Sequence, residues 1–236
     1  AAGGFVAKHG NRAVSSKSGS ADLLEKAGVN LDLTPEHVAR CVEQIGVGFM
    51  FAPAHHGAMK HAIGPRKELG TRTVFNVLGP LTNPAGAKRQ LIGVFAPDLT
   101  ETMAGVLGAL GSERAFVVHG HDGLDELTLT GPSRVTELAD GATKTYDVTP
   151  EDFGLQRVSV DQLAGGDAAQ NAAILTSILD GELGPAADVV VMNAAAAIVA
   201  GGVSQDLASG VKVARDSIEF GKARASLDRL RDVSNA

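Results

Sequence analysis

The stretch FVAKHGNRAVSSKSGSADLLEK, residues 5–26, narrows the fold more than any other: a short apolar segment leads through a small polar loop into a helical pattern. The apolar segment is typical of a buried strand. Glycine, serine hydroxyls and free N–H groups at a helix N-terminus suit a phosphate or diphosphate, and Lys8, Arg12 and Lys17 add positive charge. The pattern predicts an anion site, although a serine-rich capped loop with solvated charges explains it equally well.

Strand-like and helix-like segments alternate along the rest of the chain. The expected strands that follow are 47–51, 91–95 and 115–118. The expected helices start at Thr34-Pro35 and cover 99–110, 170–179 and most of the chain after Pro185. Residues 127–129 and 135–138 flank Gly131-Pro132 and predict an antiparallel excursion. The alternation predicts an α/β fold, with a mainly parallel central sheet flanked by helices.

The segment 56–84 departs from this alternation. It is helical in pattern but interrupted at Gly64-Pro65, Gly79-Pro80 and Asn83-Pro84. We expect it to leave the α/β layer and to form part of a small all-α domain. Residues 1–55 and 85–236 would then form the α/β domain.

Composition narrows the classes of function. The chain has 236 residues, a net charge of −6 and one cysteine, Cys41. The acidic balance argues against binding of nucleic acid, and a lone cysteine excludes an internal disulfide and a cysteine-rich zinc site. The most apolar stretch, 194–203, is far shorter than the ~20 residues that span a bilayer. Since no signal peptide is apparent either, we expect a soluble, cytoplasmic protein without a membrane partner.

Two further clusters could carry chemistry. Asp125 and Glu126 follow an expected strand, where ligands of an open α/β sheet bind, and adjacent carboxylates suit Mg²⁺. On the residues alone, a turn with a solvated acidic pair explains them more simply. Arg66 offers a planar fork that matches a carboxylate, but a surface arginine is the simpler explanation there too. Three histidines lie in this region: His55, His56 and His61. They lack the spacing of metal ligands, so zinc is not expected.

Several blocks of the sequence resemble the anthranilate phosphoribosyltransferases. They are Lys8-His-Gly-Asn-Arg12 with Gly19-Ser-Ala-Asp-Leu-Leu-Glu25, Arg72-Thr-Val-Phe-Asn-Val-Leu-Gly-Pro-Leu-Thr-Asn-Pro84, His119-Gly-His-Asp-Gly-Leu-Asp-Glu126, and Gly165-Gly-Asp-Ala168 with Asn171-Ala172. The blocks follow the family's order, and together they are far more specific than any one alone. The resemblance implies a nucleoside phosphorylase-like architecture. It also implies an enzyme of tryptophan biosynthesis that moves the 5-phosphoribosyl group of 5-phosphoribosyl 1-diphosphate to the amine of anthranilate.

The resemblance also implies roles for single positions. Those that match contacts to the phosphoribosyl donor, in the α/β domain, are Lys8, Gly10, Asn11, Ser15, Ser16 and Ser20. Those that match contacts to anthranilate are Asn11, His56, Arg66 and Gly79. Asp125 and Glu126 match the family's magnesium-binding pair, which makes Mg²⁺ the expected cofactor. No catalytic nucleophile or base is assigned, because positioning and charge stabilisation would supply most of the catalysis.

The sequence departs from the family in two respects, and two rival functions stay open. The family's upstream Gly-Thr-Gly-Gly-Asp loop and its N-terminal helices, which carry much of the dimer contact, are not in this sequence. We therefore expect an N-terminally truncated chain of a homodimeric enzyme. Gly57 stands where relatives usually have proline.

The rival functions are a pyrimidine nucleoside phosphorylase-like enzyme, which lacks the Asp-Glu pair, and a non-catalytic nucleic-acid-binding homologue of the same fold.

Overall fold

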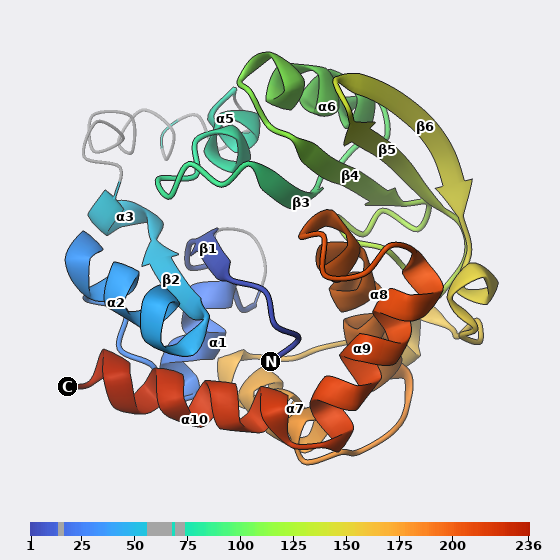
Figure 1. The fold of residues 1–236 in the computed structure, drawn as a ribbon. Coiled ribbons are helices and arrows are strands. Elements are labelled where there is room, and N and C mark those ends of the chain that lie inside the picture. Colours follow the sequence, from blue (N-terminus) through green and yellow to red (C-terminus); the bar gives the residue numbers. More distant parts are fainter. Residues whose placement is uncertain (14–16, 56–67, 69–73) are drawn as a thin grey trace.

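In the described part of the chain the strands are divided between two sheets, with helices packed around them (Figure 1). This computed structural model describes residues 1–13, 17–55, 68 and 74–236, with Phe75 and Asn76 described only in their backbone. Strands and helices alternate along much of the chain, so the predicted α/β class is confirmed. The sequence predicted one central sheet. In the part of the chain that the structure describes, β1 and β3 are not paired with each other, so the strands form two separate sheets.

The first sheet is a parallel pair, β1 (Val6–Gly10) and β2 (Val47–Phe51), in register from Val6 opposite Val47 to Gly10 opposite Phe51. The connection carries α1 (Ser20–Lys26) and α2 (Pro35–Ile45). Helix α2 begins as the sequence predicts, because Thr34 accepts a hydrogen bond from the His37 N–H and proline occupies the first turn. It ends at Gly46, whose φ of 86° favours glycine.

The second sheet has the order β3-β4-β5-β6. Strands β3 (Arg89–Gly93) and β4 (Arg114–Gly120) are parallel, and α6 (Leu99–Ala109) connects them. Strands β5 (Ser133–Ala139) and β6 (Ala142–Val148) extend the sheet antiparallel. The predicted antiparallel excursion is therefore present, but its hairpin turns between Ala139 and Ala142.

Residues 127–129 are not a strand, and here the sequence-based prediction was wrong. Their backbone groups bond to side chains and, at the Leu129 carbonyl, to the Val158 N–H at 3.0 Å, but to no neighbouring strand of the described chain. The Leu127 N–H donates to the amide oxygen of Asn193 at 2.9 Å, and the Thr128 N–H donates to the hydroxyl of Ser133 at 2.9 Å. Leu127 and Leu129 are apolar because they are buried in the core, which apolar alternation alone cannot distinguish from pairing in a sheet.

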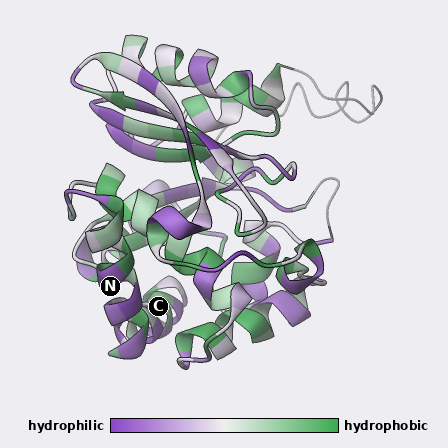
Figure 2. Ribbon diagram, turned by 90° about the vertical axis from the view of Figure 1, so that its right-hand side faces the viewer, coloured by the Kyte–Doolittle hydropathy of each residue, from purple (hydrophilic) through white to green (hydrophobic). Residues whose placement is uncertain are grey.

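The remaining helices pack around the two sheets. They are α3 (Ala52–His55), α5 (Phe75–Leu81), the short 3₁₀ helices η2 (Pro150–Phe153) and η3 (Val160–Leu163), α7 (Ala168–Leu179), α8 (Pro185–Ala200), α9 (Leu207–Glu219) and α10 (Lys222–Ser234). Helix α8 contacts β3 and β4, while α6 packs against β4 and β5. Figure 2 shows the four-stranded sheet above most of the helices, which carry apolar and polar residues side by side. None of the helices in the described ranges has the length and apolarity needed to cross a bilayer.

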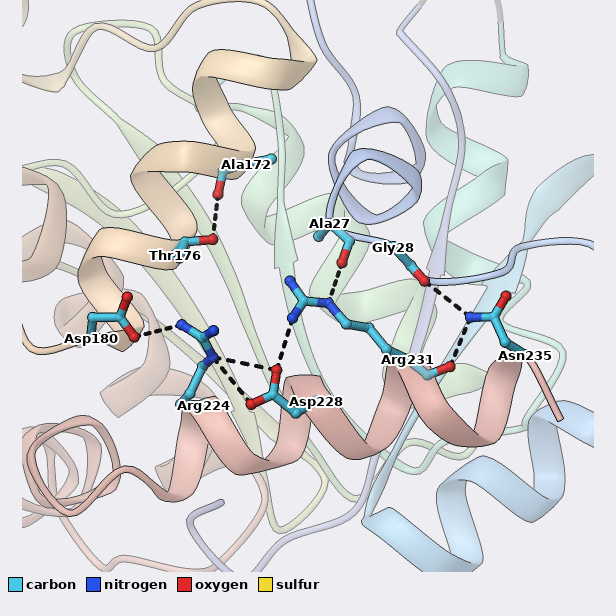
Figure 3. Close-up of polar contacts among 9 residues, drawn as sticks. All are labelled: Ala27, Gly28, Ala172, Thr176, Asp180, Arg224, Asp228, Arg231 and Asn235. Carbon is cyan, nitrogen blue, oxygen red and sulfur yellow. Dashed lines mark hydrogen bonds and ion pairs between the residues drawn. The ribbon is translucent and has the colours of Figure 1, made fainter.

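Helix α10 anchors the helix that follows the predicted anion loop (Figure 3). The Arg231 guanidinium donates to the Ala27 carbonyl, and the Asn235 amide donates to the Gly28 carbonyl at 3.0 Å. Both carbonyls lie just beyond the C-terminal end of α1, where such groups lack helical partners. The far end of the chain therefore fixes α1, and with it the helix N-terminus that begins at Ser20.

Candidate active site

A cleft of about 1750 Å³ lies between the two sheets, lined by residues of both β1 and β3. Six of the positions singled out by the sequence line it: Lys8, Gly10, Asn11, Gly79, Asp125 and Glu126. The predicted anion segment and the predicted carboxylate pair, which are far apart in the sequence, therefore open onto one cavity. Its lining also includes His9 and His55, for which the sequence predicted no role in a site.

The predicted anion segment is built on the close approach of β1 to α1. Gly10 ends β1, and a Cβ on this residue would lie 2.5 Å from the Ser20 hydroxyl oxygen and 2.9 Å from the Phe49 ring. Only glycine therefore lets the first residue of α1 come so near the strand. The Asn11 carbonyl accepts a hydrogen bond from the Ala21 N–H at 3.3 Å, which ties the helix N-terminus to the end of the strand.

Arg12 pairs with carboxylates of α1 and does not face an open anion site, contrary to the prediction from the sequence. Its guanidinium binds both oxygens of Glu25, at 2.7 and 2.9 Å, and one oxygen of Asp22 at 3.3 Å. Asp22 in turn accepts the backbone N–H groups of Ala13 and Gly19 at 2.8 and 2.9 Å, and these bonds hold the pKa of its carboxyl below the usual value. Arg12 thus closes the loop onto α1, because its carboxylate partners are on that helix.

The carboxylate pair follows β4 on a loop whose base is closed by Asp122. One oxygen of Asp122 accepts the hydroxyls of Thr128 and Thr130, each at 2.7 Å, and the other accepts the Leu124 N–H at 3.1 Å. Partial burial would raise the pKa of this carboxyl, but the threonine hydroxyls and the backbone N–H outweigh it and the pKa is lowered. Asp122 therefore stays ionised, and its hydrogen bonds hold the two ends of the loop together.

Asp125 is held by its backbone against the end of β3. Its carbonyl oxygen occupies the position of the side chain that Gly93 lacks, since a Cβ on Gly93 would lie only 1.6 Å from that oxygen. This contact places the carboxylate pair at the carboxyl end of β3 as well as of β4. In open α/β sheets that edge is where ligands bind.

Glu126 is open to solvent within the cleft, yet it is surrounded closely enough by protein that its charge is disfavoured. The loss of solvent, with a smaller contribution from the like charge of Asp125, raises the pKa of Glu126 to about 7. Lys8 acts in the opposite direction, because its ammonium attracts the Glu126 carboxylate. Lys8 and Glu126 line the same cleft, so the anion segment and the acidic loop both contribute to it.

The donor set at this loop fits magnesium better than a transition metal. Among the residues that the structure describes, no group of three histidine, cysteine or acidic side chains could hold a metal ion. Two carboxylates alone suit Mg²⁺, which commonly takes one or two protein oxygens and completes its shell with substrate phosphate and water. Thus the acidic pair suits a metal that a phosphorylated ligand helps to hold.

Four of the predicted site residues lie outside the described part of the chain: Ser15, Ser16, His56 and Arg66, as does Gly57. On the acceptor side, Asn11 and Gly79 line the cleft. The segment after α5 is tied to β1, because the Asn83 amide donates to the Ala7 carbonyl at 3.0 Å. This bond brings the end of the predicted helical segment, 56–84, to the same cavity.

The comparisons with known proteins agree with these features. The sequence profile described as "Glycosyl transferase family, a/b domain" matches residues 1–224. The anthranilate phosphoribosyltransferase of Moorella thermoacetica is 58% identical over 229 residues, which cover 97% of this chain and 68% of that protein. The anthranilate phosphoribosyltransferase of Thioalkalivibrio sulfidiphilus is 57% identical over 230 residues, with 98% and 68% covered.

The chain belongs to the anthranilate phosphoribosyltransferases. These enzymes transfer the 5-phosphoribosyl group of 5-phosphoribosyl 1-diphosphate to the amine of anthranilate in tryptophan biosynthesis. The chain spans about two thirds of the length of these relatives. The rival functions, a pyrimidine nucleoside phosphorylase-like enzyme and a nucleic-acid-binding homologue, receive no support from them.

Two solved anthranilate phosphoribosyltransferases share the fold. That of Thermus thermophilus superposes with a TM-score of 0.94 at 47% identity, covering all of this chain and 70% of its own. That of Saccharomyces cerevisiae in complex with PRPP and Mg superposes with a TM-score of 0.89 at 31% identity, covering 98% of this chain and 65% of its own.

Proposed function

We propose that the cleft between β1 and β3 binds 5-phosphoribosyl 1-diphosphate and anthranilate next to each other. The observation that carries this proposal is that Lys8 and Glu126 both line one cavity. A magnesium diphosphate requires groups that bind its anionic oxygens and groups that bind its metal. Lys8 and the helix N-terminus are of the first kind, and the carboxylate pair is of the second. The yeast enzyme solved in complex with PRPP and Mg supports the choice of donor and metal.

The end of β1 and the start of α1 would hold the anionic groups of the donor. Lys8 supplies a positive charge to the cleft, and Gly10 lets Ser20 of α1 lie close to the end of β1. The Ser20 hydroxyl lies at the N-terminus of α1, where the helix dipole favours negative charge. Asn11, together with Ser15 and Ser16 from the segment between β1 and α1, would complete this half of the site.

Asp125 and Glu126 would hold the magnesium ion. Bound there, Mg²⁺ would neutralise the negative charge that develops on the leaving diphosphate. Lys8 and the helix N-terminus would share that charge. Loss of solvent raises the pKa of Glu126 to about 7, and a bound cation would favour the ionised form of this carboxyl.

The acceptor would lie on the side of the cleft formed by Asn11 and Gly79. The guanidinium of Arg66 would pair with the carboxylate of anthranilate in two parallel hydrogen bonds, with His56 beside it. The amine nitrogen would form a bond to C1 of the ribosyl group as the C1–O bond breaks and its electron pair leaves with diphosphate. The proton that the nitrogen then gives up would pass to water or to the departing diphosphate. The structure of the yeast enzyme in complex with 4-fluoroanthranilate supports an acceptor of this shape.

The organisation of the intact enzyme is part of the same proposal. Residues 1–55 and 85–236 form the donor-binding α/β domain, and 56–84 belong to a small helical domain that carries much of the acceptor site. The enzyme is a cytoplasmic homodimer. Its partners are the two small substrates, with no role for nucleic acid or a membrane.

A fluorescence assay of anthranilate consumption tests the proposal. Asp125→Asn combined with Glu126→Gln should greatly reduce turnover at limiting Mg²⁺, because the neutral side chains hold the cation poorly. Arg66→Ala should raise the KM for anthranilate far more than the KM for the donor. Turnover of the acidic-pair variant that equals the wild type at limiting metal would contradict the metal site, and equal rises in both KM values would contradict the role of Arg66.

A further inference from the structure

Asn193 is one of two polar residues, with Asp188, in the otherwise apolar helix α8. Its amide oxygen accepts the Leu127 N–H at 2.9 Å, and its amide nitrogen donates to the Leu127 carbonyl at 2.9 Å. The same nitrogen donates to the Val189 carbonyl of its own helix at 3.0 Å. One side chain thus satisfies both backbone polar groups of the residue that follows Glu126, and is itself fixed to α8.

This contact fixes one end of the acidic pair. Leu127 is 1% exposed and packs in the core that also contains Met192 and Ala196 of α8. At the other end, the Asp125 carbonyl lies against Gly93. Glu126 is the single residue between two points whose backbone is held by packing and hydrogen bonds.

We propose that Asn193 is a positioning residue for the carboxylate pair. By binding the backbone of Leu127, it keeps the Glu126 side chain directed into the cleft opposite Lys8. This inference rests on the metal site of the proposed function. A hard cation requires its oxygen ligands within a narrow range of distances, so groups that orient the ligands affect affinity as well as stability.

The test compares two variants of Asn193 with a matched control. Asn193→Asp keeps the shape of the side chain but cannot donate to the Leu127 carbonyl, and Asn193→Ala removes both bonds. Asn171 makes the same pair of bonds elsewhere: its oxygen accepts the Gly166 N–H at 2.8 Å, and its nitrogen donates to the Gly166 carbonyl at 3.2 Å. Asn171→Ala therefore measures what the loss of such a pair does on its own.

The readout is binding of Mn²⁺ to the 236-residue chain in the presence of inorganic diphosphate, followed by electron paramagnetic resonance. Both Asn193 variants should bind Mn²⁺ roughly tenfold or more weakly than the wild type, the loss usual for a group that orients metal ligands. Asn171→Ala should lower the midpoint of thermal unfolding to a similar degree and leave the affinity for Mn²⁺ unchanged. In a Glu126→Gln background, Asn193→Ala should have little further effect on affinity.

The possible results separate this inference from the proposed function. If the wild type binds Mn²⁺ no better than the variant lacking both acidic side chains, the metal site is wrong and the role of Asn193 with it. If the acidic-pair variant loses binding while Asn193→Asp retains it, Asn193 has no positioning role and the metal site stands. Amide exchange of the wild type provides a check that needs no variant: an unprotected Leu127 N–H would overturn the inference.

Discussion

The two loops that face the cleft are built in opposite ways. The loop between β1 and α1 is closed by local contacts: the Asp22 carboxylate accepts the Ala13 N–H, and Arg12 pairs with Glu25, the two side chains being 45% and 51% exposed. The loop between β4 and β5 is closed by Thr128 with no exposure, by Asn193 and by the backbone contact at Gly93. Exposed ion pairs contribute little, whereas buried polar bonds are costly to break. The acidic loop is therefore fixed by the core, and the anion loop by its own surface.

The largest effect should come from Gly93→Ala. Its added Cβ would lie 1.6 Å from the Asp125 carbonyl oxygen, so the acidic loop must move. We expect destabilisation of about 1–3 kcal/mol, typical of overpacking, and loss of most Mg²⁺-dependent turnover. Urea unfolding and the fluorescence assay measure the two effects.

Gly105→Ala is the control for that substitution. Gly105 is exposed in the middle of α6, and apart from its own helix backbone a Cβ there meets no described atom within 4 Å. Alanine should stabilise the helix by about 0.5–1 kcal/mol and leave turnover unchanged. If Gly93→Ala behaved like Gly105→Ala, the acidic loop would not be fixed by β3.

Asp122→Asn should have the next largest effect. The amide cannot accept two threonine hydroxyls and a backbone N–H as the carboxylate does, so the loop loses charge-assisted bonds. We expect the free energy of unfolding to fall by about 1–3 kcal/mol. Urea unfolding of the variant, with Asp140→Asn on the exposed β5–β6 turn as control, measures it. Equal stability of the two variants would show that Asp122 does not close the loop.

The free energy of unfolding should depend on pH in a way that reflects the raised pKa of Glu126. The pKa of this carboxyl is raised from 4.5 to about 7, so the folded chain binds more protons than the unfolded chain between these values. The free energy of unfolding due to this group therefore falls as the pH rises through that window. Glu126→Gln should remove this part of the slope in metal-free buffer. An unchanged slope in urea titrations from about pH 5 to about pH 8 would contradict the raised pKa.

Arg12→Ala should have the smallest effect on stability. The guanidinium and its main partner, Glu25, are open to water, so loss of the pairs with Glu25 and Asp22 should change the free energy of unfolding by little more than the error of urea titration. High salt should weaken the wild-type pairs in the same way. A loss as large as that of Asp122→Asn would mean that the two loops are not held as differently as their exposure indicates.

Short motifs in the sequence singled out residues that the fold brings together. Gly10, Ser20, Asp125 and Glu126 lie around one cavity or against its lining, as expected from their blocks. No motif indicated Asn193, although a lone amide in an apolar helix is a signal of a buried polar contact. The sequence also predicted, wrongly, that Arg12 adds positive charge to the anion site. The charge of Arg12 is visible in the sequence, but the fold of α1 decides which acidic residues lie near it.

Local chemistry by itself determined much of this protein. A threonine cap and a first-turn proline begin α2, glycine ends it at Gly46, and apolar runs specify the strands. These features depend on atoms within a few residues, so the sequence alone decides them. The tertiary structure decided that 127–129 bond to Asn193 and Ser133 rather than to a strand, and that the Asp125 carbonyl fills the space at Gly93. Such contacts join segments far apart in the chain, and only the packing of α8 and β3 brings them within reach.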